Sequence, residues 1–180
     1  MKRNCFILVL ALQSAWVLYT VAVQERAWSV GKVITLETER VDPRDLLRGD
    51  YLILNYKISN VPTNLFSPTV TTDLPGSTKV YVALEPRGDF YAVARASTNQ
   101  FEPSGTQVLL KATRTWGGWG GTNAVHVEYG LERYYVREGT GNPRGKLTVQ
   151  AVVPASGRAS IKQVFLDGKP YAEAMKENSR

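Results

Sequence analysis

The chain has 180 residues, 43% of them hydrophobic and 21% charged, which is typical of a globular protein and excludes a disordered chain. Its formal charge is +6, and the excess is spread along the chain. A nucleic-acid surface requires a denser basic stripe, so we expect no nucleic-acid partner. The single cysteine, Cys5, allows neither an internal disulfide nor a cysteine-based metal site, and we expect no cofactor and no metal.

The N-terminus carries an apolar run from Cys5 to Val23, preceded by the basic residues Lys2 and Arg3. A helix of this length spans about 28 Å, close to the thickness of the hydrocarbon core of a bilayer. The basic flank favours a cytoplasmic N-terminus, with the rest of the chain on the other side. A cleaved signal peptide is the alternative, although its apolar region would be shorter.

These features predict a single-pass protein of the inner (cytoplasmic) membrane with its C-terminal domain outside the cytoplasm. We expect residues 1–4 in the cytoplasm and a transmembrane anchor over 5–23. A polar stalk over 24–29, a β domain over 30–171 and a tail over 172–180 are expected to follow.

The segment from Asp42 to Ile58 has the strongest local pattern. Asp42 is a suitable N-cap and Pro43 fits the first helical position, so about one helical turn should form and end at Gly49. From Tyr51 the period changes to two, which predicts a strand that we expect to be central. One face of that strand would carry Leu52, Leu54, Tyr56 and Ile58.

Short strands are predicted through most of the remaining chain, with little helix outside the anchor. The expected strands cover residues 30–41, 79–84, 89–96, 106–116, 123–129, 147–153 and 159–166, with 131–137 as a strand or a helical turn. Two hairpins are expected, with turns at 85–88 and 154–157. A last tight turn at 167–168 should lead to a short C-terminal helix from residue 172. A long loop is expected over 60–77 because prolines and small polar residues are frequent there. This spacing predicts an all-β fold, an antiparallel sandwich or partly closed barrel.

Several stretches match one protein family in the same order. Residues 49–56, Gly-Asp-Tyr-Leu-Ile-Leu-Asn-Tyr, fit the motif that names the bacterial GDYXXLXY family, which the chain therefore resembles. The positions carrying this resemblance are Asp42, Pro43, Arg44, Asp45, Gly49, Asp50, Tyr51, Leu54, Tyr56, Gly130, Glu132, Tyr134, Tyr135, Glu138 and Gly139. The resemblance implies a membrane-anchored protein encoded beside a multi-pass membrane protein, and it implies no catalytic residues. We expect the second motif, around Glu132, to pack against the first and to form a buried polar network of tyrosines and carboxylates.

Four residues are candidates for binding. Trp116 and Trp119 flank glycines in a loop, where indoles are suitable anchors for a partner or a bilayer surface. The alternative is that one of them closes the end of the β domain. Arg44 and Arg48 would share a helical face and offer an anion cradle, unless neighbouring aspartates neutralise them.

The pattern favours a binding or assembly protein that acts with a multi-pass membrane partner. The alternative is an anchored hydrolase that uses His126 or a site of tyrosine and glutamate residues. His126 is the single histidine, and Glu128 should project from the same strand face as His126. A lone histidine on a strand is more often structural, so no catalytic residue is assigned. A third class is a structural factor that requires only the intact fold.

Overall fold

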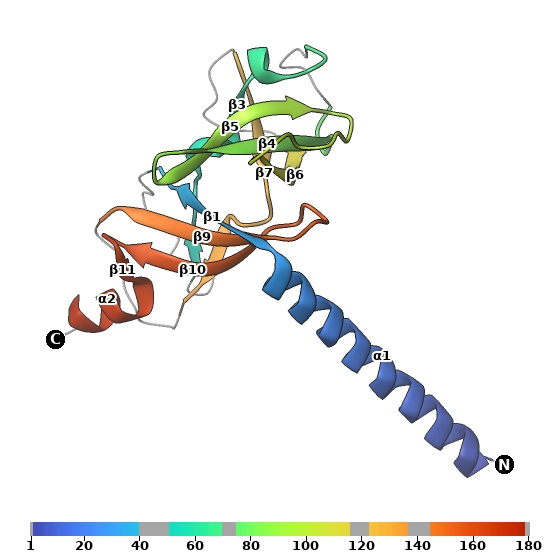
Figure 1. The fold of residues 1–180 in the computed structure, drawn as a ribbon. Coiled ribbons are helices and arrows are strands. Elements are labelled where there is room, and N and C mark those ends of the chain that lie inside the picture. Colours follow the sequence, from blue (N-terminus) through green and yellow to red (C-terminus); the bar gives the residue numbers. More distant parts are fainter. Residues whose placement is uncertain (1, 40–50, 70–74, 116–122, 137–144, 179–180) are drawn as a thin grey trace. The chain divides into compact units, whose positions relative to one another are not determined.

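The computed structural model describes residues 2–39, 51–69, 75–115, 123–136 and 145–178. The chain separates into two units at Gly31. The first unit is helix α1 (Lys2–Val30), labelled in Figure 1. Its segment Phe6–Val30, of 25 residues, contains an 18-residue window with a mean hydropathy of 2.1 and is long and apolar enough to cross a membrane. The helix continues through residues 24–29, which were expected to form a stalk.

The second unit is built almost entirely of strands, and within the described residues all their pairings in sheets are antiparallel. The strands are β1 (Lys32–Glu37), β2 (Tyr51–Ile53), β3 (Asn60–Pro62), β4 (Lys79–Arg87), β5 (Phe90–Ser97), β6 (Val108–Arg114), β7 (Ala124–Glu128), β8 (Arg133–Tyr135), β9 (Leu147–Val153), β10 (Ser160–Leu166) and β11 (Lys169–Pro170). Short 3₁₀ turns η1 (Lys57–Ser59) and η2 (Thr63–Leu65) flank β3, and helix α2 (Tyr171–Asn178) follows β11.

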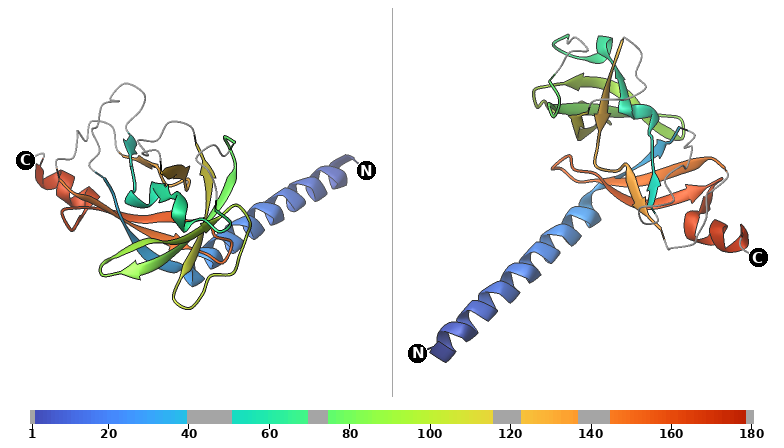
Figure 2. Two further views of the ribbon diagram at one scale, coloured as in Figure 1. Left: turned by 90° about the horizontal axis from the view of Figure 1, so that it is seen from above. Right: turned by 180° about the vertical axis from the view of Figure 1, so that it is seen from behind.

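These strands form three sheets in the described part of the chain, none of them closed. Their orders are β1-β9-β10-β11, β2-β8 and β3-β7-β6-β4-β5. The two larger sheets adjoin where β1 lies beside β5, an arrangement that can be followed in both views of Figure 2. There the Lys32 ammonium donates a hydrogen bond of 2.6 Å to the carbonyl of Thr106. The prediction of an antiparallel all-β fold with one N-terminal apolar helix is confirmed.

One hydrophobic core serves all three sheets. Alternate residues of most strands enter it, such as Leu36 in β1, Leu84 in β4 and Val149 in β9, all fully buried. This is the two-residue period of half-buried strands. The described residues therefore obtain their stability from side-chain packing between sheets rather than from covalent crosslinks.

Two expectations about the first half of the domain were wrong. The strand that starts at Tyr51 is not central, because β2 has three residues and, among the described strands, pairs only with β8. After Leu54 the backbone turns to other partners, and Glu39 N–H donates to the carbonyl of Asn55. The expected loop over 60–77 begins instead with β3, since β7 supplies a pairing partner that is remote in sequence.

The predicted hairpins are confirmed, with one difference in turn length. β4 extends to Arg87, which pairs with Phe90, so the β4–β5 turn consists of Gly88 and Asp89. β9 and β10 pair as expected, and the Asp167–Gly168 turn leads to β11. Residues 131–137 contain strand β8 rather than a helical turn, and the expected C-terminal helix is α2.

Glu37 at the end of β1 joins two segments that are distant in sequence. Its two carboxylate oxygens lie 2.6 Å from the Lys146 ammonium and 2.7 Å from that of Lys57. Hydrogen bonds from Lys146 and then Lys57 lower the pKa of the Glu37 carboxyl. The two lysines are more than half exposed, so solvent screens much of this attraction.

We expect Glu37→Gln to lower the free energy of unfolding by no more than about 1 kcal/mol at neutral pH. Because the folded-state pKa is lowered, the contribution is present above the unfolded pKa of about 4 and is lost as the pH falls through the folded value. Urea denaturation of both proteins between neutral pH and pH 3 measures this difference. Glu85→Gln, which removes the single exposed pair with Arg87, is the control. A Glu37 effect that grows on acidification would contradict the assignment.

Gly157, between β9 and β10, lies directly against β6. Its carbonyl accepts a hydrogen bond of 2.8 Å from the N–H of Lys111. Its φ is +76°, and a Cβ there would lie 3.2 Å from the carbonyl oxygen of Leu109 and 3.3 Å from Cγ of Lys111. Glycine is therefore required both by the backbone conformation and by the close approach of the two segments.

Gly157→Ala is expected to destabilise the domain by about 1–2 kcal/mol, through strain at positive φ and crowding against β6. Gly105→Ala is the matched control, because Gly105 has φ +58° but no atom within 4 Å of the added Cβ. Thermal denaturation of the two variants separates the crowding from the strain. Equal losses in both would show that the close approach to β6 costs nothing.

Candidate functional site

The two family motifs meet in the small sheet formed by β2 and β8. Tyr51 pairs with Tyr135 and Leu52 with Tyr134. The backbone contact continues beyond the strands, since Leu54 N–H donates a hydrogen bond of 2.8 Å to the carbonyl of Glu132. The expectation that the second motif packs against the region of Tyr51 is confirmed for these residues.

Two buried tyrosines stabilise the inner side of this site. The hydroxyl of each one donates a hydrogen bond to a backbone carbonyl near the other. The Tyr56 hydroxyl donates a hydrogen bond of 2.8 Å to the carbonyl of Leu131. The Tyr129 hydroxyl donates one of 2.7 Å to the carbonyl of Ile58. The two bonds run in opposite directions and join residues 56–58 to residues 129–131. We call this pair of hydrogen bonds the tyrosine clasp.

Glu132 adds a charge beside the tyrosine clasp without joining the hydroxyls. Its carboxylate oxygen Oε1 accepts a hydrogen bond from the backbone N–H of Tyr129. Burial, and secondarily the Glu132 charge, raise the pKa of both Tyr56 and Tyr129, so both hydroxyls stay protonated. The expected network of second-motif tyrosines and carboxylates was wrong in its members. The buried hydroxyls are those of Tyr56 and Tyr129 and donate to carbonyls, whereas Tyr135 of the second motif is exposed. Both protonated hydroxyls donate to backbone carbonyls and so join the two segments.

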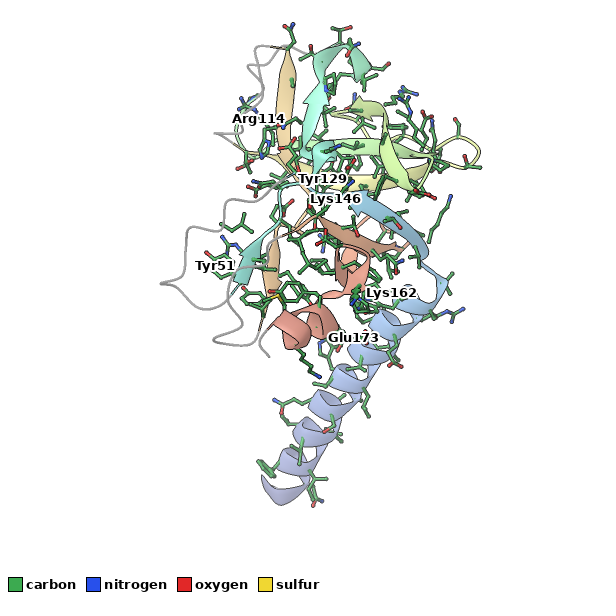
Figure 3. All side chains as sticks on the ribbon, turned by 90° about the vertical axis from the view of Figure 1, so that its left-hand side faces the viewer. Tyr51, Arg114, Tyr129, Lys146, Lys162 and Glu173 are labelled. Carbon is green, nitrogen blue, oxygen red and sulfur yellow. The ribbon has the colours of Figure 1, made fainter. Side chains whose placement is uncertain are left out.

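The outer side of the β2–β8 sheet is exposed and aromatic. Tyr135 is 75% exposed and Ile53 is 41% exposed. The rings of Tyr51, labelled in Figure 3, and Tyr135 have centroids 6.1 Å apart. The Arg133 guanidinium lies 5.7 Å from the centre of the Tyr51 ring. We call Tyr51, Ile53, Arg133 and Tyr135 the aromatic face.

Tyr134 lies on the opposite side of β8 and connects the site to α2. Its ring packs edge-on against Tyr171, with centroids 5.9 Å apart. Burial, followed by the neighbouring Tyr134, raises the pKa of Tyr171. Neighbouring tyrosines in the second motif therefore have different roles: Tyr134 packs inward and Tyr135 faces solvent.

His126 on β7 contacts Asn60 rather than an acid. Its Nδ1 lies 2.9 Å from Oδ1 of Asn60, the residue directly opposite on β3. Glu128 is exposed two residues further on. Among the described residues there is no group of three or more His, Cys, Asp and Glu side chains that would hold a metal ion. Through its contact with Asn60, His126 joins β7 to β3.

Several predicted site residues lie outside the described part of the chain. They are Asp42, Pro43, Arg44, Asp45, Arg48, Gly49, Asp50, Trp116, Trp119, Glu138 and Gly139. Sequence reasoning also missed two contributors to the site. Tyr129 ends the buried alternation Val125-Val127-Tyr129, which was a readable signal, whereas Arg133 occupies an unspecified position of the motif.

The fold and this site define a small antiparallel β protein that follows an N-terminal apolar helix. Comparison with protein families matches residues 13–164 to the family described as GDYXXLXY protein. The match covers most of the chain, which therefore belongs to the GDYXXLXY family. A search of curated proteins and a search of solved structures each found no match.

Tyr56→Phe and Tyr129→Phe should each lower the free energy of unfolding by about 1–2 kcal/mol, because each leaves a buried carbonyl without its donor. Urea denaturation measures the loss. Tyr135→Phe removes an exposed hydroxyl and should change stability by less than about 0.5 kcal/mol. Losses of the same size at all three positions would remove the distinction between the clasp and the aromatic face.

Proposed function

We propose that this chain is a single-pass protein of the bacterial inner membrane whose β domain binds a multi-pass membrane protein on the extracytoplasmic, periplasmic side. Helix α1 supports the anchor, since it is long and apolar enough to span a bilayer. Lys2 and Arg3 support the orientation, because basic residues are favoured on the cytoplasmic side. Family membership supports the choice of a membrane partner.

The aromatic face is the observation that carries the binding role. The tyrosine clasp and the buried side chains of Leu52 and Leu54 account for the structural part of the two motifs. Tyr51 and Tyr135 also belong to these motifs, yet their rings lie on the outer surface together with Arg133 and Ile53. Tyrosine and arginine are the residues enriched in the energetic centres of protein interfaces. A solvent-facing group of this composition is better explained by a partner than by the fold.

The partner chemistry follows from the side chains of the aromatic face. Two tyrosine rings and an isoleucine offer flat apolar area, and the Arg133 guanidinium adds five donors for a carboxylate or for backbone carbonyls. Such a surface suits a loop of another protein that presents an apolar side chain beside an acidic one. Trp116 and Trp119, which lie outside the described residues, are separate candidates for partner binding.

Tyr135→Ala and Arg133→Ala in the full chain should each reduce recovery of a multi-pass partner from solubilised membranes by about tenfold, as expected for residues at an interface centre. Quantitative mass spectrometry of affinity-purified samples measures this. Arg95→Ala is the matched control, because Arg95 stacks 4.6 Å from the Phe101 ring away from the site. Its partner recovery should equal that of the wild type.

A Tyr51→Ala/Tyr135→Ala double variant with normal melting and undiminished partner recovery would refute the aromatic face as the interface. In that case Trp116→Ala/Trp119→Ala tests the remaining candidates. Failure of the wild-type chain to retain any multi-pass protein after crosslinking in intact membranes would refute the proposed partner class.

A further inference from the structure

An open cavity of about 450 Å³ lies on the five-stranded sheet, and the aromatic-face residues do not line it. Lys79 and Tyr81 line it from β4, Lys111 and Thr113 from β6, Glu128 from the end of β7, and Arg158 from the β9–β10 connection. The register places Tyr81 opposite Lys111, and Thr113 opposite both Lys79 and Glu128. These polar side chains therefore belong to two adjacent rows across one face of the sheet.

The β9–β10 connection completes the cavity because it is attached to β6. The hydrogen bond from Lys111 N–H to the carbonyl of Gly157 places the next residue, Arg158, beside the sheet. A Cβ on residue 157 would lie only 3.3 Å from Cγ of Lys111. Because Gly157 has no Cβ, the connection can lie this close to β6. Arg158 is thus held at the cavity by backbone contacts that leave its guanidinium exposed to solvent.

The cations that line this cavity outnumber its carboxylates. Within the described ranges, Lys79, Lys111 and Arg158 form no ion pair, whereas Lys57 and Lys146 share Glu37. Three cations and one carboxylate, Glu128, give the lining a charge of +2. Placing like charges around one cavity costs electrostatic energy that a bound anion would recover.

We propose that this cavity binds a phosphate group, either of a soluble phosphorylated molecule or of a phosphomonoester lipid. A phosphate monoester carries about −1.5 to −2 charges at neutral pH, which matches the charge of the lining. Arg158 offers a planar fork of donors to two phosphate oxygens, and Lys79 and Lys111 add ammonium donors. The Thr113 and Tyr81 hydroxyls are additional neutral donors. The volume of about 450 Å³ accommodates a group of this size with part of the attached molecule.

The test uses the full chain in neutral-detergent micelles and inorganic phosphate as the probe. Acetylation rates of individual lysines, measured by mass spectrometry, should fall at Lys79 and Lys111 as phosphate is added. Lys162, an exposed lysine on β10 that is labelled in Figure 3, should keep its rate. Protection should weaken as sodium chloride is raised, because the binding charges are exposed. Equal protection at Lys162, or none at Lys111, would overturn the proposal.

Arg158→Gln should weaken phosphate protection of Lys111 by about tenfold, since it removes a charged bidentate donor. Arg158 is exposed in a connection, so this variant is expected to fold; Lys162→Gln, which also removes one exposed cation, should leave protection unchanged. If both variants lose the same amount of protection, the effect depends only on the overall charge of the protein, and the proposed site is overturned.

The same measurement on the full chain in nanodiscs distinguishes the two sources of phosphate. Protection of Lys111 in discs containing phosphatidic acid, compared with phosphatidylcholine alone, assigns the cavity to a lipid headgroup. Protection by added phosphate but not by phosphatidic acid assigns it to a soluble ligand. Partner recovery by the Arg158→Gln variant should stay at the wild-type level, so this proposal and the proposed function can fail independently.

Discussion

The domain depends on the tyrosine clasp, because this clasp stabilises a sheet that has little stability of its own. A two-stranded sheet is marginal in water, and β2 and β8 have only three residues each. The hydroxyls of Tyr56 and Tyr129 extend the contact beyond the strands by bonding to carbonyls at Leu131 and Ile58. Both bonds are buried, where an unpaired carbonyl would cost more than an exposed one. The pairing of β2 with β8 is therefore fixed by side chains as much as by its ladder.

This arrangement divides the family motifs between two roles. Leu52, Leu54 and Tyr56 are buried, and Leu54 and Tyr56 are completely inaccessible to solvent. Because successive residues of a strand point to opposite sides, fixing these inner residues also fixes where Tyr51 and Ile53 point. The clasp thus positions the aromatic face although it does not contact it. A rigid support of this kind lowers the entropic cost of binding through the exposed rings.

Much of the fold could be predicted from the sequence because its signals are local. The inward face of residues 52–58 and the hairpins β4–β5 and β9–β10 follow from two-residue alternation and turn residues. The short extent of β2 and the presence of β3 could not be predicted, since both depend on partners 62 to 84 residues away. The carbonyls that accept the hydrogen bonds of the clasp also depend on tertiary structure and could not be predicted. The same holds for the approach of Lys79, Lys111 and Arg158 to one another. Alternation indicates which residues are buried, but not which distant backbone they contact.

Under the proposed function, the membrane anchor compensates for the weak binding expected of the small aromatic face. Four side chains cover much less than the roughly 1,600 Å² of a typical stable interface, so this face alone would bind weakly. A transmembrane helix that keeps both partners in one bilayer makes the encounter effectively intramolecular, with local concentrations on the order of millimolar. Weak contacts then suffice, and the rings can stay exposed without requiring a large apolar surface. The domain can therefore remain a well-packed unit on its own and still associate when its partner is present.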